Sequence, residues 1–259
     1  MSVDTIEVED RGAVSVVSIR NPKAKNALSR HAIRAIAEAV QAASERGSTR
    51  AVVLTGSGGT FSAGAALTPG GLASAEDEDT LPPILDDVAA AITAITTCSV
   101  PVIAAVEGAA AGVGASLAIA SDLLVAGEGA YFLLPFGRIG LMPDGAVMRT
   151  AVAALGRART LDLALRQQRL PAEEARSAGL VATTVADGTA LDTALEWAAE
   201  FSGSSRVALA HTKEWVNRAA LPELDEWLRD ESHAQAALMR GDDHVEGVAA
   251  FFEKRPPRY

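Results

Sequence analysis

The amino-acid sequence predicts an α/β fold with a largely parallel sheet, followed by a region that is helical almost throughout. Short apolar segments of strand length alternate with longer segments in which apolar residues recur at helical spacing. After Met142 the helical pattern dominates, and only residues 180–185 keep the character of a strand. The 259 residues could form one large α/β domain or two smaller ones, and 49% of them are hydrophobic, enough for a substantial core.

The chain begins with a pattern that is typical of a β-hairpin. Residues 3–9 and 14–19 alternate polar and apolar side chains with a period near two, around a tight turn at residues 10–12. Residues 21–28 follow as a second turn, which is rich in helix-breaking residues and is the most basic part of this half of the chain.

The middle of the chain alternates helices and strands. We expect Ser29 to cap a helix that ends near Gly47, because apolar residues between them fall on one helical face. The further expected elements are a strand at 51–55, a helix at 82–97, strands at 101–106 and 122–126 with a helix at 116–121 between them, helices at 145–155, 158–168 and 171–178, a strand at 180–185, and helices that begin near Leu191, Ser205, Pro222 and His244. We expect the helical last third to pack on the α/β core or on another subunit.

Charge and composition exclude several classes of protein. The net charge of −10 and the isoelectric point near 4.9 argue against a nucleic-acid partner, which would require a basic face. The uncharged residues 88–106 approach the length of a membrane span, but their threonines, Ser99 and Pro101 favour a core helix followed by a strand. The first residues lack the apolar core of a signal peptide, so we expect a cytoplasmic protein with no membrane partner. The single cysteine, Cys98, is expected to be a buried structural thiol.

Two loops between these elements, residues 56–66 and 67–81, do not by themselves indicate a binding site. Residues 56–66 are rich in glycine after a short strand, but the helix and the ribose-binding acid of a dinucleotide-binding fingerprint do not follow at the required spacing. Residues 67–81 include four acids, and a solvated connector is the simplest interpretation.

Small residues in two places indicate a site that could hold negative charge. Residues 112–114 open a buried helix, where unpaired N–H groups and the helix dipole favour an anion. Residues 61–65 follow a separate strand and could offer a second N–H group, which would complete an oxyanion hole. Close packing of a helix against a sheet explains small residues equally well. The apolar stretch of residues 100–146 then leads to one acid, Asp144.

Taken together, these segments resemble the enoyl-CoA hydratase/isomerase family, which has the crotonase fold. The resemblance extends over almost the whole chain, and the segments that carry it are residues 21–28, 61–65, 101–122, 140–145, 156–159, 175–181 and 252–256. It implies an α/β fold in which a ClpP-like spiral of ββα units forms a core, here residues 1–200, before a C-terminal helical trimerisation region, here residues 201–259. It also implies an acyl-CoA thioester as substrate and assembly as a homotrimer or as a hexamer built from two trimers.

The resemblance also implies roles for single residues. The backbone N–H groups of Ala65 and Val113 would hold the thioester oxygen and stabilise an enolate. The residues that would contact the coenzyme A part are Lys23, Lys25, Ala63, Gly64, Gly112, Phe251 and Lys254. Among them Ala63 would lie against the adenine and Lys23 or Lys25 near the phosphates, while Lys254 holds a position that often reaches a neighbouring subunit. Simple surface charge explains each lysine equally well. Coenzyme A would be part of the substrate, so we expect no separate cofactor and no metal.

Two departures from the family pattern bear on the reaction. A typical hydratase has two catalytic glutamates at positions that match Ser116 and Phe136 here. Hydration of an enoyl thioester needs two positioned carboxylates, and neither serine nor phenylalanine is a general base of useful pKa. Hydratase activity is therefore doubtful, and we expect Ser116, Phe136 and Leu141 to line the substrate pocket instead.

Asp144 is the acid that the family pattern retains. Residues 139–144 resemble the isomerase branch, which includes bacterial epoxyphenylacetyl-CoA isomerases and peroxisomal-type enoyl-CoA isomerases. In that branch an acid at this position moves a proton between C2 and C4 of the acyl chain. Apolar neighbours such as Phe136 and Leu141 would raise the pKa of Asp144 by desolvation. An alternative role is that of N-cap for a helix that begins at Gly145.

Other interpretations stay open from the sequence alone. A catalytically silent acyl-CoA-binding paralogue would keep the pocket and lose the reaction. Residual hydratase activity would need another acid such as Glu107, which is better explained as a cap or a surface partner. An aspartyl-nucleophile dehalogenase would add a histidine base, but the histidines do not lie between the oxyanion loop and the core strand; they are His31, His211, His233 and His244. Ser116 also nearly matches a nucleophile elbow, although it does not directly follow a strand.

Overall fold

The computed structural model describes residues 5–69, 71 and 81–259. Within them the central element is a six-stranded sheet with the order β1-β2-β3-β4-β6-β9. Its strands are β1 (Thr5–Arg11), β2 (Val14–Arg20), β3 (Ala51–Gly56), β4 (Val102–Val106), β6 (Leu123–Gly127) and β9 (Thr183–Val185). β1 pairs antiparallel with β2, and the later pairings are all parallel. The predicted hairpin and the predicted, largely parallel sheet are thus confirmed.

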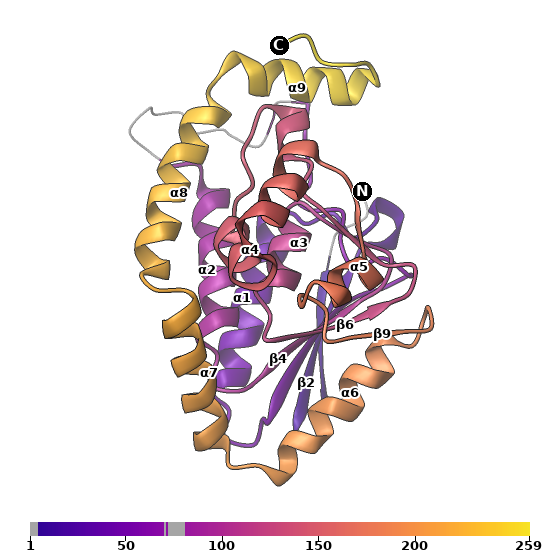
Figure 1. Ribbon diagram of the computed structural model, residues 1–259, viewed down its shortest axis with the longest axis vertical. Helices are drawn as coiled ribbons and strands as arrows, with labels where there is room; N and C mark the ends of the chain where they lie inside the picture. The colour runs from indigo at the N-terminus through magenta and orange to yellow at the C-terminus, as the bar shows by residue number, and fades with distance from the viewer. Residues whose placement is uncertain (1–4, 70, 72–80) are drawn as a thin grey trace.

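Helices cover the two faces of this sheet unequally. α1 (Arg30–Glu45), α2 (Pro83–Thr97) and α3 (Val113–Ile119) belong to the larger hydrophobic core, whereas α6 (Ala190–Glu200) covers the other face (Figure 1). Successive strand residues point to opposite faces, so Val52 and Leu54 of β3 enter the larger core while Val53 packs against α6. Ser29 caps α1 as predicted, because its Oγ accepts a hydrogen bond from the N–H of Ala32 (3.2 Å).

A second, three-stranded sheet lies beside the first, and the sequence did not predict it. Its strands are β5 (Ala109–Ala111), β7 (Tyr131–Leu133) and β8 (Leu170–Pro171), in the order β5-β7-β8. Each strand has three residues or fewer, too short for the alternating pattern by which a strand is recognised. α3 also begins at Val113, three residues before the helix expected at residues 116–121, which places Val113 in its first turn.

The helical last third of the described chain packs on the α/β core of its own chain, which is one of the two arrangements expected from the sequence. The remaining elements are η1 (Pro22–Ala24), η2 (Phe136–Ile139), α4 (Val147–Arg166), α5 (Ala172–Ser177), η3 (Phe201–Gly203), α7 (Arg206–Ala220), α8 (Leu224–Met239) and α9 (Asp242–Glu253). α7 and α8 run along the same side as α2, and α9 lies across the end of the molecule (Figure 1). The two helices expected at 145–155 and 158–168 form one element with a break at Gly156, whose φ is 73°.

The apolar stretch of residues 88–106 lies within the α/β core. It forms part of α2 and then β4, as predicted. In the part of the chain that the structure describes, no helix combines the length and the apolar character needed to cross a membrane. Cys98, between the two elements, is a buried free thiol, also as predicted. Most of the acidic loop, residues 70 and 72–80, lies outside the described residues.

Candidate active site

Most of the residues singled out in the sequence surround one cavity. It has a volume of about 700 Å³ and is enclosed by the loops that follow β2, β3 and β7, the start of α3, and side chains of α2, α8 and α9. The predicted residues that line it are Lys23, Lys25, Ala63, Gly64, Ala65, Gly112, Val113, Phe136, Asp144 and Phe251. Segments far apart in the sequence therefore meet here, and Asp144 is the only acid among the described residues that line the cavity.

The two loops at the mouth of the cavity are joined by Asn26. Its Oδ1 accepts a hydrogen bond from the N–H of Asn21 (2.8 Å), and its Nδ2 donates to the carbonyl oxygens of Ser57 (2.8 Å) and Thr60 (2.6 Å). The N–H of Ala63 also donates to the carbonyl of Lys25 (2.9 Å). These hydrogen bonds hold the loop with Ala63 against the loop with Lys23 and Lys25, and both loops line the cavity. Asn26 was not predicted as part of the site, although an asparagine in a turn that contains proline was a usable signal.

Ala65 and Val113, the two residues expected to form an oxyanion hole, each have a backbone N–H group that secondary structure does not use. Leu28 uses both of its backbone groups to pair with Gly64 and Ala66 (2.8 Å each), so the N–H of Ala65 between them points to the opposite side. Val113 is the first residue of α3, where an N–H has no acceptor within the helix. Both residues line the cavity, so two segments of the chain each place a backbone N–H group at its wall.

Gly64 allows these two segments to approach each other. Its φ is +94°, a conformation that other residues rarely adopt. A Cβ atom at this position would lie 2.8 Å from the carbonyl oxygen of Ala111 and 3.4 Å from the nitrogen of Val113. The small residue predicted here is therefore required by the close approach of the loop to the start of α3.

Asp144 lies in the loop between η2 and α4 and is almost completely buried, with 5% of its surface exposed. Its Oδ2 accepts a hydrogen bond from Nε2 of Gln235 on α8 (3.0 Å), while its Oδ1 has no hydrogen-bond partner among the described residues. The alternative role as an N-cap is wrong, because α4 begins at Val147 after Ala146 and has no side-chain cap.

Burial gives the carboxyl group of Asp144 an unusual proton affinity. Desolvation, followed by the nearby carboxylate of Glu231, raises the pKa of Asp144 from 3.8 to about 7, and the hydrogen bond from Gln235 opposes this rise. The predicted direction and its main cause are confirmed. The contribution of Glu231 was not predicted, because it comes from a helix almost ninety residues further along the chain.

Ser116 and Leu141 are buried but do not line the cavity, contrary to expectation. The hydroxyl of Ser116 instead donates a hydrogen bond to the backbone carbonyl of Asp144 (2.7 Å) and so supports the loop from behind. Phe136 does line the cavity, as expected. Where a hydratase would have two glutamates, this chain therefore has a buried hydroxyl and an apolar wall.

Of the two C-terminal residues expected to contact coenzyme A, one lines the cavity and the other does not. Phe251 lines the cavity and is 58% exposed, whereas Lys254 is exposed at the end of α9 and does not line the cavity of its own chain. A contact of Lys254 with a neighbouring subunit stays a prediction. Arg138 of η2 lines the cavity together with Lys23 and Lys25 and was not predicted.

Residual hydratase activity through Glu107 and dehalogenase chemistry with a histidine base both lack the required residue in the described lining of this cavity. Glu107 does not line the cavity, and its Oε1 accepts a hydrogen bond from the N–H of Ala190 at the start of α6 (3.0 Å). It is a cap, as expected. No histidine is found among the described residues that line the cavity, so a dehalogenase-type histidine base is not in place. The same part of the chain holds no group of three or more potential metal ligands.

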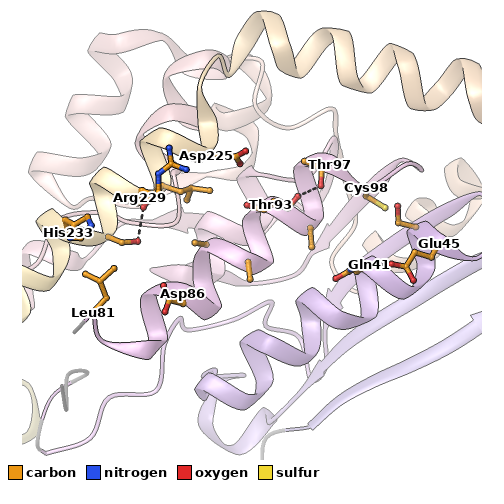
Figure 2. Close-up of a pocket in the computed structure, with 16 residues that line it drawn as sticks. Gln41, Glu45, Leu81, Asp86, Thr93, Thr97, Cys98, Asp225, Arg229 and His233 are labelled. Carbon is orange, nitrogen blue, oxygen red and sulfur yellow. Dashed lines mark hydrogen bonds between the residues drawn. The ribbon is translucent and has the colours of Figure 1, made fainter. Parts of the chain in front are cut away.

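A second cavity, of about 810 Å³, lies on the outer side of α2 between α1 and α8. Figure 2 shows Asp225, Arg229 and His233 of α8 facing Thr93 and Thr97 of α2. Its lining comes mainly from α1, α2 and α8 and contains none of the predicted site residues. It lacks the pair of backbone donors beside a buried acid, so the smaller cavity is the better candidate for the active site.

Two backbone N–H groups and a buried acid thus lie around one cavity of the α/β core, as the resemblance to the crotonase fold implies. Comparisons with known proteins show the family. The model of the enoyl-CoA hydratase/isomerase family matches residues 9–259. The chain therefore belongs to the enoyl-CoA hydratase/isomerase family, whose members are enzymes that act on acyl-CoA thioesters.

Individual relatives cover the whole chain or most of it. A probable enoyl-CoA hydratase of Rhodobacter capsulatus is 36% identical over 100% of this chain and 99% of its own. The 1,2-epoxyphenylacetyl-CoA isomerase of Escherichia coli is 38% identical over 61% of each chain. Among solved structures, an enoyl-CoA hydratase from Mycobacterium avium subsp. paratuberculosis has a TM-score of 0.89 at 35% identity and covers 98% of each chain. The crotonase fold expected from the sequence is thus confirmed.

Proposed function

We propose that this protein is an enoyl-CoA isomerase that shifts the double bond of a 3-enoyl-CoA to the 2-enoyl position. One observation carries the proposal: the described lining of the cavity has a single carboxyl group, Asp144, beside two backbone N–H donors. Moving a proton between two carbons needs one group that acts first as base and then as acid. The 1,2-epoxyphenylacetyl-CoA isomerase of Escherichia coli, similar over part of the chain, supports an isomerase.

In the proposed reaction the thioester oxygen accepts hydrogen bonds from the N–H groups of Ala65 and Val113. The carboxylate of Asp144 removes a proton from C2, and the electrons move into a dienolate whose negative charge the two N–H groups stabilise. The double bond then lies between C2 and C3 once the protonated Asp144 returns the proton to C4. The enzyme ends as it began, so the reaction needs no separate cofactor. A pKa near 7 suits both steps, because the group must give and take a proton at similar cost.

Hydration is less well supported, although several relatives are named as probable hydratases. A hydratase needs a second carboxylate on the substrate side to position water, and the position that would supply one holds Phe136. Glu231 lies near Asp144, but it is not among the residues that line the substrate cavity. The second carboxylate that hydration requires is therefore missing from the described lining of the substrate cavity.

The experiment is to assay the purified protein with 3-enoyl-CoA substrates and follow formation of the conjugated 2-enoyl thioester by ultraviolet absorbance. We expect Asp144→Asn to lower kcat by about a hundredfold or more, in line with loss of a general acid–base group. Affinity for the acyl-CoA should change little, because the backbone donors are retained. Unchanged turnover in Asp144→Asn would contradict the proposal.

Glu107→Gln provides a matched control, because it also neutralises one acid but keeps an oxygen that can accept from Ala190. We expect this variant to retain wild-type isomerisation. A catalytically silent acyl-CoA-binding protein is the second candidate, since the same cavity would serve it. Binding of acyl-CoA by the wild-type protein, without isomerisation or hydration of any enoyl chain length, would favour this second candidate.

A further inference from the structure

Two polar residues on α8 lie against the loop that carries Asp144. Gln235 is fully buried and Glu231 is 7% exposed. They are four residues apart, which places them on the same face of the helix. Neither residue lines the substrate cavity. Buried polar groups at such positions are costly unless their hydrogen bonds are satisfied, so their partners are informative.

Gln235 binds the backbone of Met142, two residues before Asp144, and also one carboxylate oxygen of Asp144. Its Oε1 accepts a hydrogen bond from the N–H of Met142 (3.2 Å), and its Nε2 donates to the carbonyl of the same residue (2.9 Å). This pair of bonds fixes which end of the amide carries the nitrogen. The same Nε2 therefore has to donate to Oδ2 of Asp144 (3.0 Å), which matches a carboxylate acceptor.

Glu231 holds the segment that follows Asp144. Its Oε1 accepts a hydrogen bond from the N–H of Ala146 (2.8 Å), and its Oε2 accepts from Nε1 of Trp227 (3.2 Å). Side chains on one face of α8 thus form hydrogen bonds with the backbone on both sides of Asp144.

We propose that Gln235 and Glu231 are positioning residues for the reaction proposed above, which hold Oδ2 of Asp144 in place and leave Oδ1 as the oxygen that moves the proton. Oδ1 is buried and has no hydrogen-bond partner among the described residues. An oxygen without a partner keeps its lone pairs for the substrate proton, while the bonded oxygen fixes the plane of the carboxyl group. Proton transfer between two carbons requires such a fixed orientation, because the same oxygen must reach both.

The two residues act on the charge of Asp144 in opposite directions. The amide of Gln235 stabilises the carboxylate form, whereas the negative charge of Glu231 disfavours it. The other charged residues of the described cavity lining are Lys23, Lys25 and Arg138, all of them exposed. In the smaller space on the α8 side of Asp144, Glu231 is the only other charged residue of the described lining.

The test is a pH titration of the Asp144 carboxyl group by infrared spectroscopy, with the signal assigned by its absence in Asp144→Asn. Gln235→Leu should raise the pKa of Asp144, and Glu231→Gln should lower it. Ser232→Ala is the matched control, since Ser232 is buried on the same helix but its hydroxyl donates to Leu228 rather than to the Asp144 loop. It should leave the titration unchanged. Shifts in the same direction, or no shift in either variant, would overturn the proposal.

Kinetics supply a second readout that a purely structural role would not give. Gln235→Leu should lower kcat by about ten- to a hundredfold with KM for the enoyl-CoA within about twofold, because orientation of the acid is lost while the binding surface is kept. An equal rise in KM with unchanged kcat would count against positioning. The titration needs no turnover, so it can succeed even where the protein fails to isomerise any enoyl-CoA; the two proposals therefore fail separately.

Discussion

At the scale of a single residue, the burial of Asp144 links the proposed reaction to stability. Between its ordinary pKa of 3.8 and its folded value of about 7, the folded protein holds a proton that the unfolded chain has released. Stability from this group is fully present below pH 3.8 and is lost as the pH rises through about 7. An acid suited to moving protons near neutral pH therefore destabilises the fold increasingly as the pH rises from about 4 to about 7, and by the full amount above pH 7.

Replacing Asp144 with asparagine should remove this penalty. We expect Asp144→Asn to raise the free energy of unfolding at pH 8 by on the order of 4 kcal/mol, because the neutral amide needs no burial of charge and can still accept from Gln235. The gain should shrink toward zero as the pH approaches 4. Denaturant unfolding at pH 8 and pH 4.5 measures both values. An equal gain at the two pH values would show that the effect is not due to ionisation.

At the scale of a helix, α7 depends on one buried cation. No residue of α7 is buried as a whole, yet the side chain of Lys213 is only 7% exposed. Its Nζ donates to the carbonyl of Ile95 (2.7 Å) and to the carboxylate of Asp122 (2.7 Å). Burial raises the pKa of Asp122, and the ammonium group of Lys213 opposes that rise. The pair attaches the helix to the end of α2 and to the start of β6.

Removing that cation should cost more than a surface ion pair would. We expect Lys213→Met to lower the free energy of unfolding by about 3 kcal/mol, because the largely buried carboxylate of Asp122 loses its cation and keeps only the hydrogen bond from the N–H of Val102 (2.7 Å). Urea unfolding at pH 7 measures the loss. The double variant Lys213→Met with Asp122→Asn should recover much of it, since no charge then stays buried. A loss below about 1 kcal/mol in the single variant would contradict this assignment.

Helices and strands also show how far the sequence alone could predict the site. Ala65 and Val113 were predicted because their motifs resemble those of the family, and Asp144 because it is the acid at the end of an apolar stretch and in a family motif. The strand β5 was missed because three alanines carry no alternating pattern. Gln235 and Glu231 were missed because their role arises only when α8 packs on a loop about ninety residues earlier in the chain. Two polar residues on the buried face of an amphipathic helix were the available signal.

At the scale of the whole molecule, exposed apolar side chains gather on the C-terminal helices. Val207, Trp215 and Val216 of α7 are each about 60% exposed or more, and Phe251 and Phe252 of α9 are also exposed. Apolar groups on an outer face are typical of surfaces that another protein covers. The family is typically oligomeric, so a second copy of this chain is the simplest partner for these helices.

The protein should therefore be a homotrimer or a hexamer in solution, held in part by α7. Light scattering coupled to size-exclusion chromatography should give a mass of three or six times 26.7 kDa. Trp215→Asp should shift the mass toward the monomer, because the charged group would have to lose its water at an apolar contact. Val8→Asp, which changes an exposed valine on β1, is the control and should keep the wild-type mass. A monomeric wild-type protein would contradict the assignment, and it would also leave Lys254 without a neighbouring subunit to reach.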